Sequence, residues 1–270
     1  MSTSERLIPS QAQAGGRQSA LFLRHLFAYE NFIRYCRSES ICLDFGCGDG
    51  YGARLLSNHA KKVIGVDIDP DTVREAAARY QKENLFFQKI GKSILPFPDA
   101  NFNIVVSAQV LEHLSDPMAY LREARRVLMP GGYLLLATPN KAMRLKDRKK
   151  PWNRFHVQEF TAEELKALLR QLFDRVIIFG ISTNNESLLR EELARIRWRR
   201  RVHSWDILGI RRWIPAGVEY WVSRTMRSIH VKRLTKKDIP GVHKDYSLTD
   251  YYLATENVGD SFDLFAVAQK

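Results

Sequence analysis

The chain has 270 residues, 45% of them hydrophobic, and its 14 Phe, 10 Tyr and 5 Trp supply ample material for a globular core. No stretch approaches the roughly 20 apolar residues needed to cross a bilayer, and residues 1–18 lack the apolar core of a signal peptide. The three cysteines, Cys36, Cys42 and Cys47, do not have the number or spacing of a zinc ribbon or a disulfide framework. These features predict a cytoplasmic protein with reduced thiols.

The formal net charge of +12 is concentrated in two segments. Residues 186–244 carry 15 Lys and Arg against 6 Asp and Glu, and residues 141–154 carry 7 against 1. The rest of the chain is slightly acidic. A basic balance fits nucleic acid, an anionic membrane surface or a phosphorylated substrate, so the position of the charge matters more than its size.

Apolar periodicity predicts that strands alternate with helices after a mobile polar tail at residues 1–18. The helices of this pattern are expected over residues 21–37, 51–59, 72–81, 117–128 and 162–172. The strands are expected over residues 41–43, 62–66, 85–89, 102–107, 133–138, 173–181 and 262–268. The fourth of these strands is almost continuously apolar, as expected of a central parallel strand.

The turn after the first predicted strand holds glycines at alternate positions, Gly46, Gly48 and Gly50. Glycine lets the backbone bend sharply and lets a ligand lie against it, because no Cβ stands in the way. The N–H groups that open the next helix are expected to point at that ligand. About twenty residues on, the second strand ends in Asp67, where a dinucleotide fold places the acid that binds a ribose diol. The loop differs, however, from the G-x-G-x-x-G fingerprint of nicotinamide sites.

Six segments in this order resemble the class I S-adenosylmethionine-dependent methyltransferases: DFGCGDGYG, VIGVDIDP, LPFPD, FNIVVSAQVLEHL, EARRVLMPGGYLLLATPN and FHVQEFTAEEL. The resemblance implies an α/β fold, namely a Rossmann-like doubly wound seven-stranded sheet whose strand seven is antiparallel. Strands six and seven are usually joined by a short turn, but here roughly 80 residues intervene. We therefore expect a methyltransferase domain over residues 19–183 and 260–270, with a basic helical insertion over residues 184–259 that contains helices at 184–201 and 218–230.

The resemblance also implies S-adenosyl-L-methionine as cofactor. By this resemblance Asp44, Gly46 and Gly48 line the methionine part of the cofactor, and Cys47 is included with them as a cofactor-binding residue. Backbone glycines and a carboxylate are also what a zwitterion requires on chemical grounds.

Further along the cofactor, the resemblance implies that Asp67 binds the ribose hydroxyls, that Ile68 lies against the adenine and that Gln109 borders the methyl group. An alternative for Ile68 is a place in the core. Many relatives carry an acid after strand three that binds the adenine amino group, whereas this chain has Gly91 there.

Methyl transfer from a sulfonium to an alcohol needs a group that removes the hydroxyl proton, and a neutral histidine suits this task. The candidate catalytic residues are His113, directly after strand four, and His156, which has Glu159 close enough to orient it. Each histidine has a structural role as the alternative to catalysis. His113 would form a hydrogen bond to the loop backbone, and His156 would cap a turn.

Some quinone-biosynthesis relatives bind a divalent metal through acids near an E-H pair, which here is Glu112 and His113. Gln109 stands at the earlier acid position, and one carboxylate with one imidazole is too few for a hard cation. No metal is therefore expected. The chain also lacks the Asn/Asp-Pro-Pro-aromatic motif of exocyclic-amine methyltransferases after strand four, which makes nucleic acid an unlikely acceptor.

The basic segment mixes arginine with Trp198, Trp205 and Trp213, a composition that suits anionic lipid headgroups, a diphosphate-linked substrate or RNA. A plain alternative is a solvated lid whose aromatics pack on the sheet. The chain most resembles small-molecule and glycan methyltransferases of cell-surface polysaccharide synthesis. We therefore expect O-methylation of a saccharide or lipid-linked glycan, with residues 190–237 on the inner face of an anionic membrane.

Two other functions stay open from the sequence. One is a methyltransferase of a quinone-like or lipid-like small molecule or of RNA. The other is a non-catalytic partner subunit that binds S-adenosylmethionine without turnover, although nothing in the glycine loop is damaged.

Overall fold

The computed structural model describes residues 20–91, 94–146, 151–153, 155–204 and 246–270, with side chains except at 202–204. The chain divides into two compact units. The larger unit comprises the chain up to residue 184 and from residue 247 onward, and it contains every strand of the described residues. The smaller unit comprises residues 185–246.

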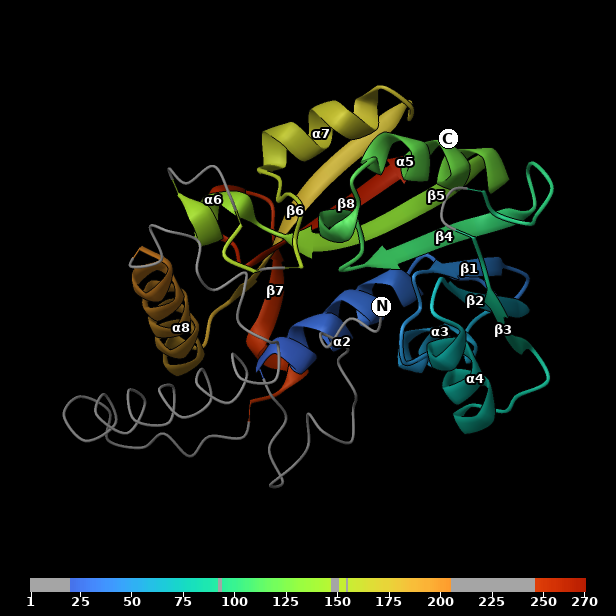
Figure 1. Cartoon of the computed structure of the whole chain (residues 1–270), viewed down its shortest axis with the longest axis horizontal. Helices are drawn as coiled ribbons and strands as arrows, with labels where there is room; N and C mark the ends of the chain where they lie inside the picture. Colours follow the sequence, from blue (N-terminus) through green and yellow to red (C-terminus); the bar gives the residue numbers. More distant parts are fainter. Residues whose placement is uncertain (1–19, 92–93, 147–150, 154, 205–245) are drawn as a thin grey trace. The chain divides into compact units, whose positions relative to one another are not determined.

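An eight-stranded sheet with the order β3-β2-β1-β4-β5-β8-β6-β7 forms the centre of the larger unit (Figure 1). Strands β1 to β5 pair in parallel, and β8 pairs antiparallel with both β5 and β6. This arrangement confirms the Rossmann-like α/β fold and the antiparallel final strand. The strands are β1 (Ile41–Phe45), β2 (Lys62–Asp67), β3 (Leu85–Lys89), β4 (Phe102–Ala108), β5 (Leu128–Pro139), β6 (Arg175–Thr183), β7 (Tyr251–Ala254) and β8 (Asp263–Gln269).

Strand β7 is an addition to the expected seven strands. It pairs antiparallel with β6 at the edge of the sheet, with Tyr251 opposite Thr183 and Ala254 opposite Gly180. This strand lies inside residues 184–259, which the sequence analysis assigned to the helical insertion. That assignment is corrected: residues 247–259 belong with the sheet, because a four-residue strand acquires its hydrogen bonds only from the neighbouring β6.

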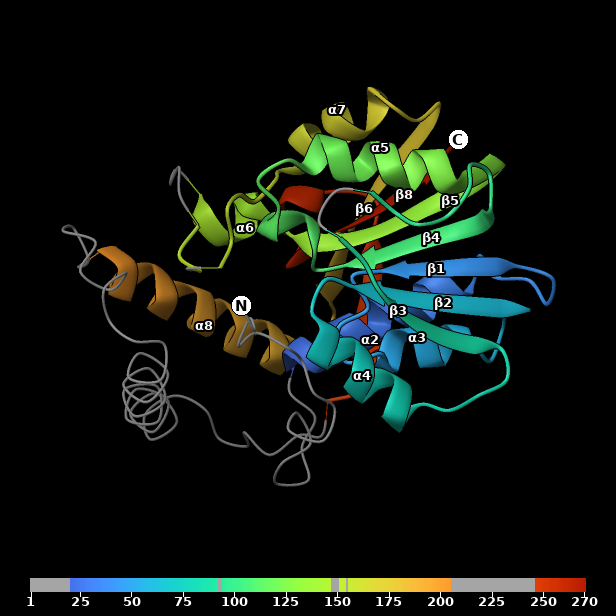
Figure 2. The same ribbon diagram turned by 45° about the vertical axis from the view of Figure 1, so that its right-hand side comes forward.

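Helices cover both faces of the sheet. Figure 2 shows α2, α3 and α4 on one face and α5 and α7 on the other. A capping box formed by Thr161 and Glu164 begins α7, and the Asp69 side chain caps α4. These helices are α2 (Ala20–Ile33), α3 (Tyr51–Leu56), α4 (Pro70–Arg79), α5 (Pro117–Val127) and α7 (Ala162–Arg170), with shorter segments α6 (Lys141–Leu145), η1 (Leu111–His113), η3 (Leu248–Asp250) and η4 (Val258–Asp260) in the connections.

Two predicted boundaries are corrected by backbone hydrogen bonds. The first helix ends at Ile33 rather than at residue 37, because Tyr35 and Cys36 donate to carbonyls three residues back and tighten the chain into a turn. Strand β5 begins at Leu128 rather than at the predicted residue 133, so the stretch from Pro130 to Gly132 is part of the strand. Its partner is the C-terminal residue Lys270, which exchanges hydrogen bonds of 2.9 and 3.0 Å with Gly131 and Gly132.

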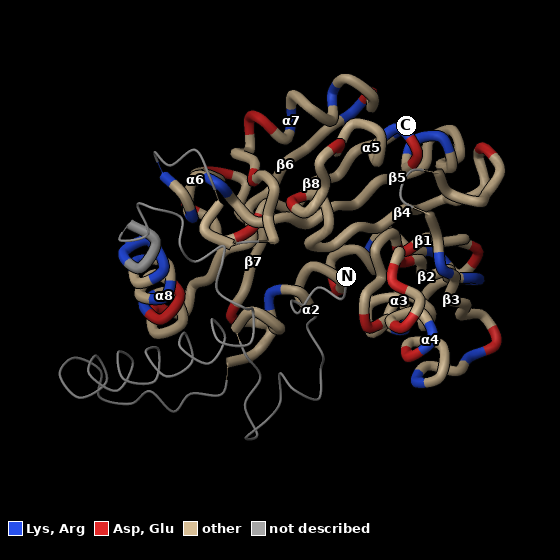
Figure 3. Tube along the Cα trace, in the orientation of Figure 1, with Lys and Arg blue, Asp and Glu red and all other residues tan. Residues whose placement is uncertain are grey.

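The smaller unit contains one helix among its described residues, α8 (Glu186–Ser204). Ion pairs at helical spacing join Glu186 to Arg190 and Glu191 to Arg195, and Figure 3 shows how densely basic residues follow this helix. The helix expected over residues 218–230 lies outside the described residues. No helix in the described ranges is long and apolar enough to span a membrane.

The turn that follows β1 depends on Gly46. Its φ of 88° lies in the left-handed region, and a Cβ at this position would stand 2.5 Å from Cγ2 of Val110. The same turn therefore packs against the segment that follows β4 and cannot accept a larger residue without displacing it.

We predict that Gly46→Ala lowers the free energy of unfolding by about 1–3 kcal/mol, because it adds both backbone strain and a clash. Gly91→Ala is the matched control, since a Cβ there meets no atom within 4 Å. Chemical denaturation of both variants checks the prediction, and equal losses for the two would contradict it.

Candidate active site

The carboxyl ends of β1 and β2 place two carboxylates beside the glycine turn. Asp67, the last residue of β2, accepts hydrogen bonds from the N–H groups of Gly48 at 3.1 Å and Asp69 at 3.0 Å. Its own carbonyl accepts from Ile90, which follows β3. The Asp67 carboxylate is thus anchored at the edge of the sheet where open α/β folds bind their ligands.

The N–H groups at the start of the glycine turn are bonded within the protein, and the expectation that the N–H groups opening the next helix point at a ligand stays a prediction. The N–H groups of Gly46 and Cys47 both donate to the carbonyl of Val66, at 2.8 and 2.9 Å. Helix α3 is only six residues long, and its Ala53 N–H bonds the carboxyl of Asp44. These donors hold the turn against β2 because the chain must reverse within a few residues.

The Asp44 side chain is fully buried at the base of this site. The hydroxyl of Tyr29 lies 3.2 Å from each of its carboxyl oxygens. Burial raises the pKa of Asp44 to about 7, and the neighbouring Asp67 charge adds to the rise against the opposing bonds from Tyr29 and Ala53. Asp44 therefore titrates near neutrality, and a cationic group placed beside it favours its ionised form.

Two aromatic residues, Tyr29 of α2 and Tyr51 of α3, pack against each other beside this carboxyl group. Tyr29 is buried, and a Cβ on Gly52 would lie 2.0 Å from its ring, so the ring fills the space over α3. The hydroxyl of Tyr51 lies 3.3 Å from Nδ1 of His25, and burial, with Arg24 nearby, lowers the pKa of His25 to about 3. His25 is therefore neutral at physiological pH.

The remaining predicted cofactor residues differ in accessibility. Ile68 is 55% exposed directly after Asp67, so it is not a core residue. Cys47 is buried, with its Cβ toward the strand residue Gly65. Gln109 has a φ of 56° after β4, and its N–H donates to the carbonyl of Ala137 at 2.8 Å.

This edge fits the cofactor that the sequence implies. A Cβ on Gly48 would meet nothing within 4 Å, so the turn leaves room for a ligand against its backbone. The anchored Asp67 carboxylate suits a ribose diol, and the buried Asp44 carboxyl suits an ammonium group. The exposed aliphatic side chain of Ile68 offers a surface for a flat base, and Gly91 leaves open space beyond it.

Two histidines lie together at the ends of β4 and β5. The rings of His113 and His156 are 4.9 Å apart and meet edge to face at 89°. Nδ1 of His113 is 3.0 Å from the carbonyl oxygen of Phe155, and Nδ1 of His156 is 2.7 Å from the Glu159 carboxylate. Because both partners are acceptors, each Nδ1 carries the hydrogen of a neutral ring, and each Nε2 carries a lone pair.

Arg144 holds the Glu159 carboxylate in place beside His156. Its Nε lies 3.2 Å from both carboxyl oxygens of Glu159. Burial alone opposes ionisation of Glu159, but Arg144 and His156 together lower its pKa below the ordinary value. The predicted pairing of Glu159 with His156 is confirmed. Arg144 was missed, because nothing within the basic loop distinguishes one arginine from its neighbours.

Glu112 is the third ionisable residue beside His113 and His156. It is fully buried, its Oε2 accepts a hydrogen bond of 3.0 Å from Thr138, and its Oε1 has no hydrogen-bond partner among the residues that the structure describes. Burial raises its pKa to about 8. One possible ligand atom each from Glu112, His113 and His156 lie within 4.8 Å of one another. The sequence alone offers only two such ligands, Glu112 and His113, and the expectation that no metal binds here stays a prediction.

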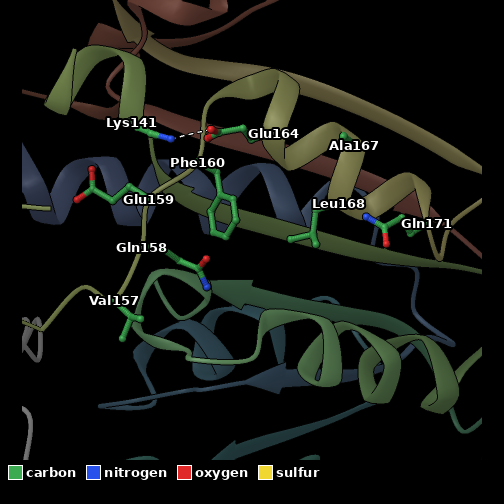
Figure 4. Close-up of a pocket in the computed structure, with 9 residues that line it drawn as sticks. All are labelled: Lys141, Val157, Gln158, Glu159, Phe160, Glu164, Ala167, Leu168 and Gln171. Carbon is green, nitrogen blue, oxygen red and sulfur yellow. Dashed lines mark hydrogen bonds and ion pairs between the residues drawn. The ribbon is translucent and has the colours of Figure 1, made fainter. Parts of the chain in front are cut away.

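A cavity of about 460 Å³ lies beside this group (Figure 4). Glu159, Phe160 and Leu168 line it between the segment after β5 and helix α7, and the ion pair of Lys141 with Glu164, at 2.6 Å, also borders it. The cavity therefore shares Glu159 with the histidine group.

Residues 43–136 match the protein family described as a methyltransferase domain. A probable S-adenosylmethionine-dependent methyltransferase of Mycolicibacterium smegmatis is 40% identical over 167 residues, which are 62% of either chain. A protein of the same description from Mycobacterium tuberculosis is 37% identical over 167 residues, which are 62% of this chain and 58% of the relative. The chain thus spans about three fifths of the length of these relatives.

Solved structures with the same fold extend further along the chain. YcgJ of Bacillus subtilis superimposes with a TM-score of 0.52 at 21% identity, covering 91% of this chain and 96% of its own. The cyclase SpnF superimposes with a TM-score of 0.56 at 21% identity, covering 90% of this chain and 79% of its own. At this identity the likeness establishes the fold alone.

Residues 43–136 thus match a methyltransferase domain, and the sheet with its carboxyl edge has the fold of the class I S-adenosylmethionine-dependent methyltransferases. The protein's cofactor is S-adenosyl-L-methionine.

We predict that affinity for the product S-adenosylhomocysteine rises with pH up to about 7 and then levels off. The free-protein pKa of Asp44 is about 7, and the bound ammonium requires the ionised carboxylate. Below that pH, affinity falls by up to about tenfold per unit. Calorimetric titration between pH 5.5 and 8 measures the profile.

Asp44→Asn is the control for this profile. It keeps an oxygen that accepts from Tyr29 but removes the titration, so its weaker affinity is expected not to change with pH. A wild-type affinity independent of pH over this range would contradict the assignment of Asp44.

Proposed function

We propose that this protein transfers the methyl group of S-adenosylmethionine to a hydroxyl group, with His156 as the proton acceptor. The observation that carries the proposal is the pair of ion contacts that joins Arg144 to Glu159 and Glu159 to His156, beside the carboxyl ends of β4 and β5. Bound S-adenosylmethionine supplies an electrophilic methyl group, so the protein must align the acceptor and remove one proton.

Each of these three residues has a defined task. Nε2 of His156 takes the proton of the acceptor hydroxyl as its oxygen bonds to the methyl carbon. The Glu159 carboxylate then stabilises the imidazolium through Nδ1, and Arg144 keeps that carboxylate ionised in its buried position. His113, fixed by the Phe155 carbonyl, is the second candidate for the same proton.

We predict that His156→Gln lowers kcat by about 100-fold or more while S-adenosylhomocysteine binding persists, because the proton acceptor is lost. His113→Gln is expected to have the smaller effect. His59→Gln, at an exposed histidine of the same fold, is the control and should leave kcat unchanged. An unchanged rate for His156→Gln would remove the residue from the mechanism.

Turnover is expected to survive exhaustive dialysis against EDTA, because the proton goes to an imidazole rather than to a metal-bound oxygen. The activity of dialysed protein, with and without added Mg²⁺ or Zn²⁺, measures this. Loss on dialysis and recovery with one cation would instead make Glu112, His113 and His156 a metal site.

For the acceptor we propose a saccharide or lipid-linked glycan intermediate of cell-surface polysaccharide synthesis. Support comes from the resemblance of the six sequence segments and from the excess of basic residues at 186–244, which suits a phosphate-bearing substrate or an anionic membrane at residues 190–237. The described part of this segment, α8, carries six arginines in 19 residues.

A second acceptor class follows from the relatives. A ubiquinone biosynthesis O-methyltransferase of Cereibacter sphaeroides is 31% identical over 101 residues, and a 27-O-demethylrifamycin SV methyltransferase of Amycolatopsis mediterranei is 35% identical over 105 residues. These matches favour a hydroxylated small molecule as the alternative to a glycan. Formation of S-adenosylhomocysteine with each acceptor class decides between them, and its absence with all acceptors would favour a binding role without turnover.

We predict that the protein binds vesicles containing anionic phospholipid and that binding falls steeply with salt. Changing Arg199, Arg200 and Arg201 to Glu should weaken binding by tenfold or more, since each basic residue near the surface contributes about 1 kcal/mol. Lys62→Glu, on the sheet unit, is the matched control. Comparable binding to RNA by co-sedimentation and gel shift would favour the nucleic-acid alternative.

A further inference from the structure

Two cysteines face each other across the junction of α2 and β1. Cys36 lies in the turn after α2, and Cys42 is the second residue of β1. Their Sγ atoms are 3.8 Å apart, and no disulfide joins them. The cofactor site and the histidine group make no use of either thiol.

The two partners differ in freedom and exposure. Cys42 is fully buried, and its backbone is fixed by register with Val63 of β2 and Ile104 of β4. Cys36 is half-buried in a turn that rests on the hydrogen bond from its N–H to the carbonyl of Ile33, at 2.9 Å. A disulfide requires an S–S separation near 2.05 Å. The turn can supply this approach of less than about 2 Å by moving Cys36, without disturbing the sheet.

We propose that Cys36 and Cys42 form a redox-sensitive thiol pair that hydrogen peroxide or an organic hydroperoxide oxidises to a disulfide. The Cys36 thiolate attacks the peroxide oxygen, which yields a sulfenic acid at Cys36 and releases water or an alcohol. Cys42 then displaces the sulfenic oxygen as a second water. The two thiols lose two electrons in total, and the peroxide gains them.

The local environment assigns these two roles. The hydrogen bond from Cys42 lowers the pKa of the Cys36 thiol, although partial burial opposes it. The same contact together with burial raises the pKa of Cys42. The half-buried Cys36 is therefore the thiol that reaches the thiolate state and meets the oxidant, and the fully buried Cys42 resolves the sulfenic acid.

The bond would join the end of α2 to β1 two residues before Asp44. Because α2 also carries Tyr29, whose hydroxyl bonds Asp44, the cross-link fastens together the two elements that enclose the buried carboxyl of the cofactor site. Cys47 is not part of this pair, because it is buried in the glycine turn, where its Sγ lies 4.0 Å from the carbonyl oxygen of Gly48.

Peptide mapping of the full-length protein tests the pair. The reduced protein is treated with stoichiometric hydrogen peroxide, alkylated in acid with a denaturant, and digested with trypsin without reduction. Cleavage after Arg34, Arg37 and Arg54 separates residues 35–37 from residues 38–54, so a bond between Cys36 and Cys42 appears as two linked peptides. Dithiothreitol is expected to abolish the linked species.

Single variants identify the partners. The linked peptides should persist in Cys47→Ser and disappear in Cys36→Ser and Cys42→Ala, where the alanine is chosen because the site is buried. Persistence in Cys42→Ala, a bond internal to residues 38–54, or Cys36 found only as a sulfinic acid would each overturn the proposal. Circular dichroism of the unoxidised variants and of wild type checks that each variant folds. If Cys42→Ala does not fold, the Cys47→Ser result alone decides whether Cys42 or Cys47 is the partner of Cys36.

Discussion

The position of the Asp67 carboxylate is the constraint on which the cofactor edge depends. The carboxylate accepts hydrogen bonds from the N–H groups of Gly48 and Asp69, and the backbone carbonyl of Asp67 accepts one from the N–H of Ile90. One residue therefore connects the glycine turn to the ends of β2 and β3. The glycines of the turn adopt left-handed backbone conformations without strain because they lack a Cβ, and these hydrogen bonds, with those to Val66, hold the turn in place. An open surface at Gly48 and an exposed Ile68 follow from that geometry.

Asp44 shows how the same edge obtains a charge that responds to its ligand. A carboxyl group with no exposed surface is costly to ionise, and the bonds from Tyr29 and Ala53 only partly compensate. The Asp44 side chain therefore changes between its protonated and ionised forms near neutral pH, and a cation bound beside it favours the ionised form. Helix α2 contributes to this balance through Tyr29, whose ring fills the space that Gly52 leaves open.

At the neighbouring strand ends, the chemistry depends on residues that the chain brings from three places. His113 and Glu112 follow β4, His156 and Glu159 follow β5, and Arg144 comes from α6. A cyclase shares this fold, so the sheet alone does not specify methyl transfer, and the acceptor chemistry depends on these side chains.

Local sequence determined the alternation of strands and helices, the glycine turn, the capping box at Thr161 and the pairing of His156 with Glu159, because each depends on residues a few positions apart. Tertiary structure alone decided the rest. The edge strand β7, the extension of β5 through Gly131 and the unpaired oxygen of Glu112 among the described residues all depend on partners distant in sequence or on burial. Sequence periodicity reports which face is buried, but it cannot report which donor a buried acceptor will meet.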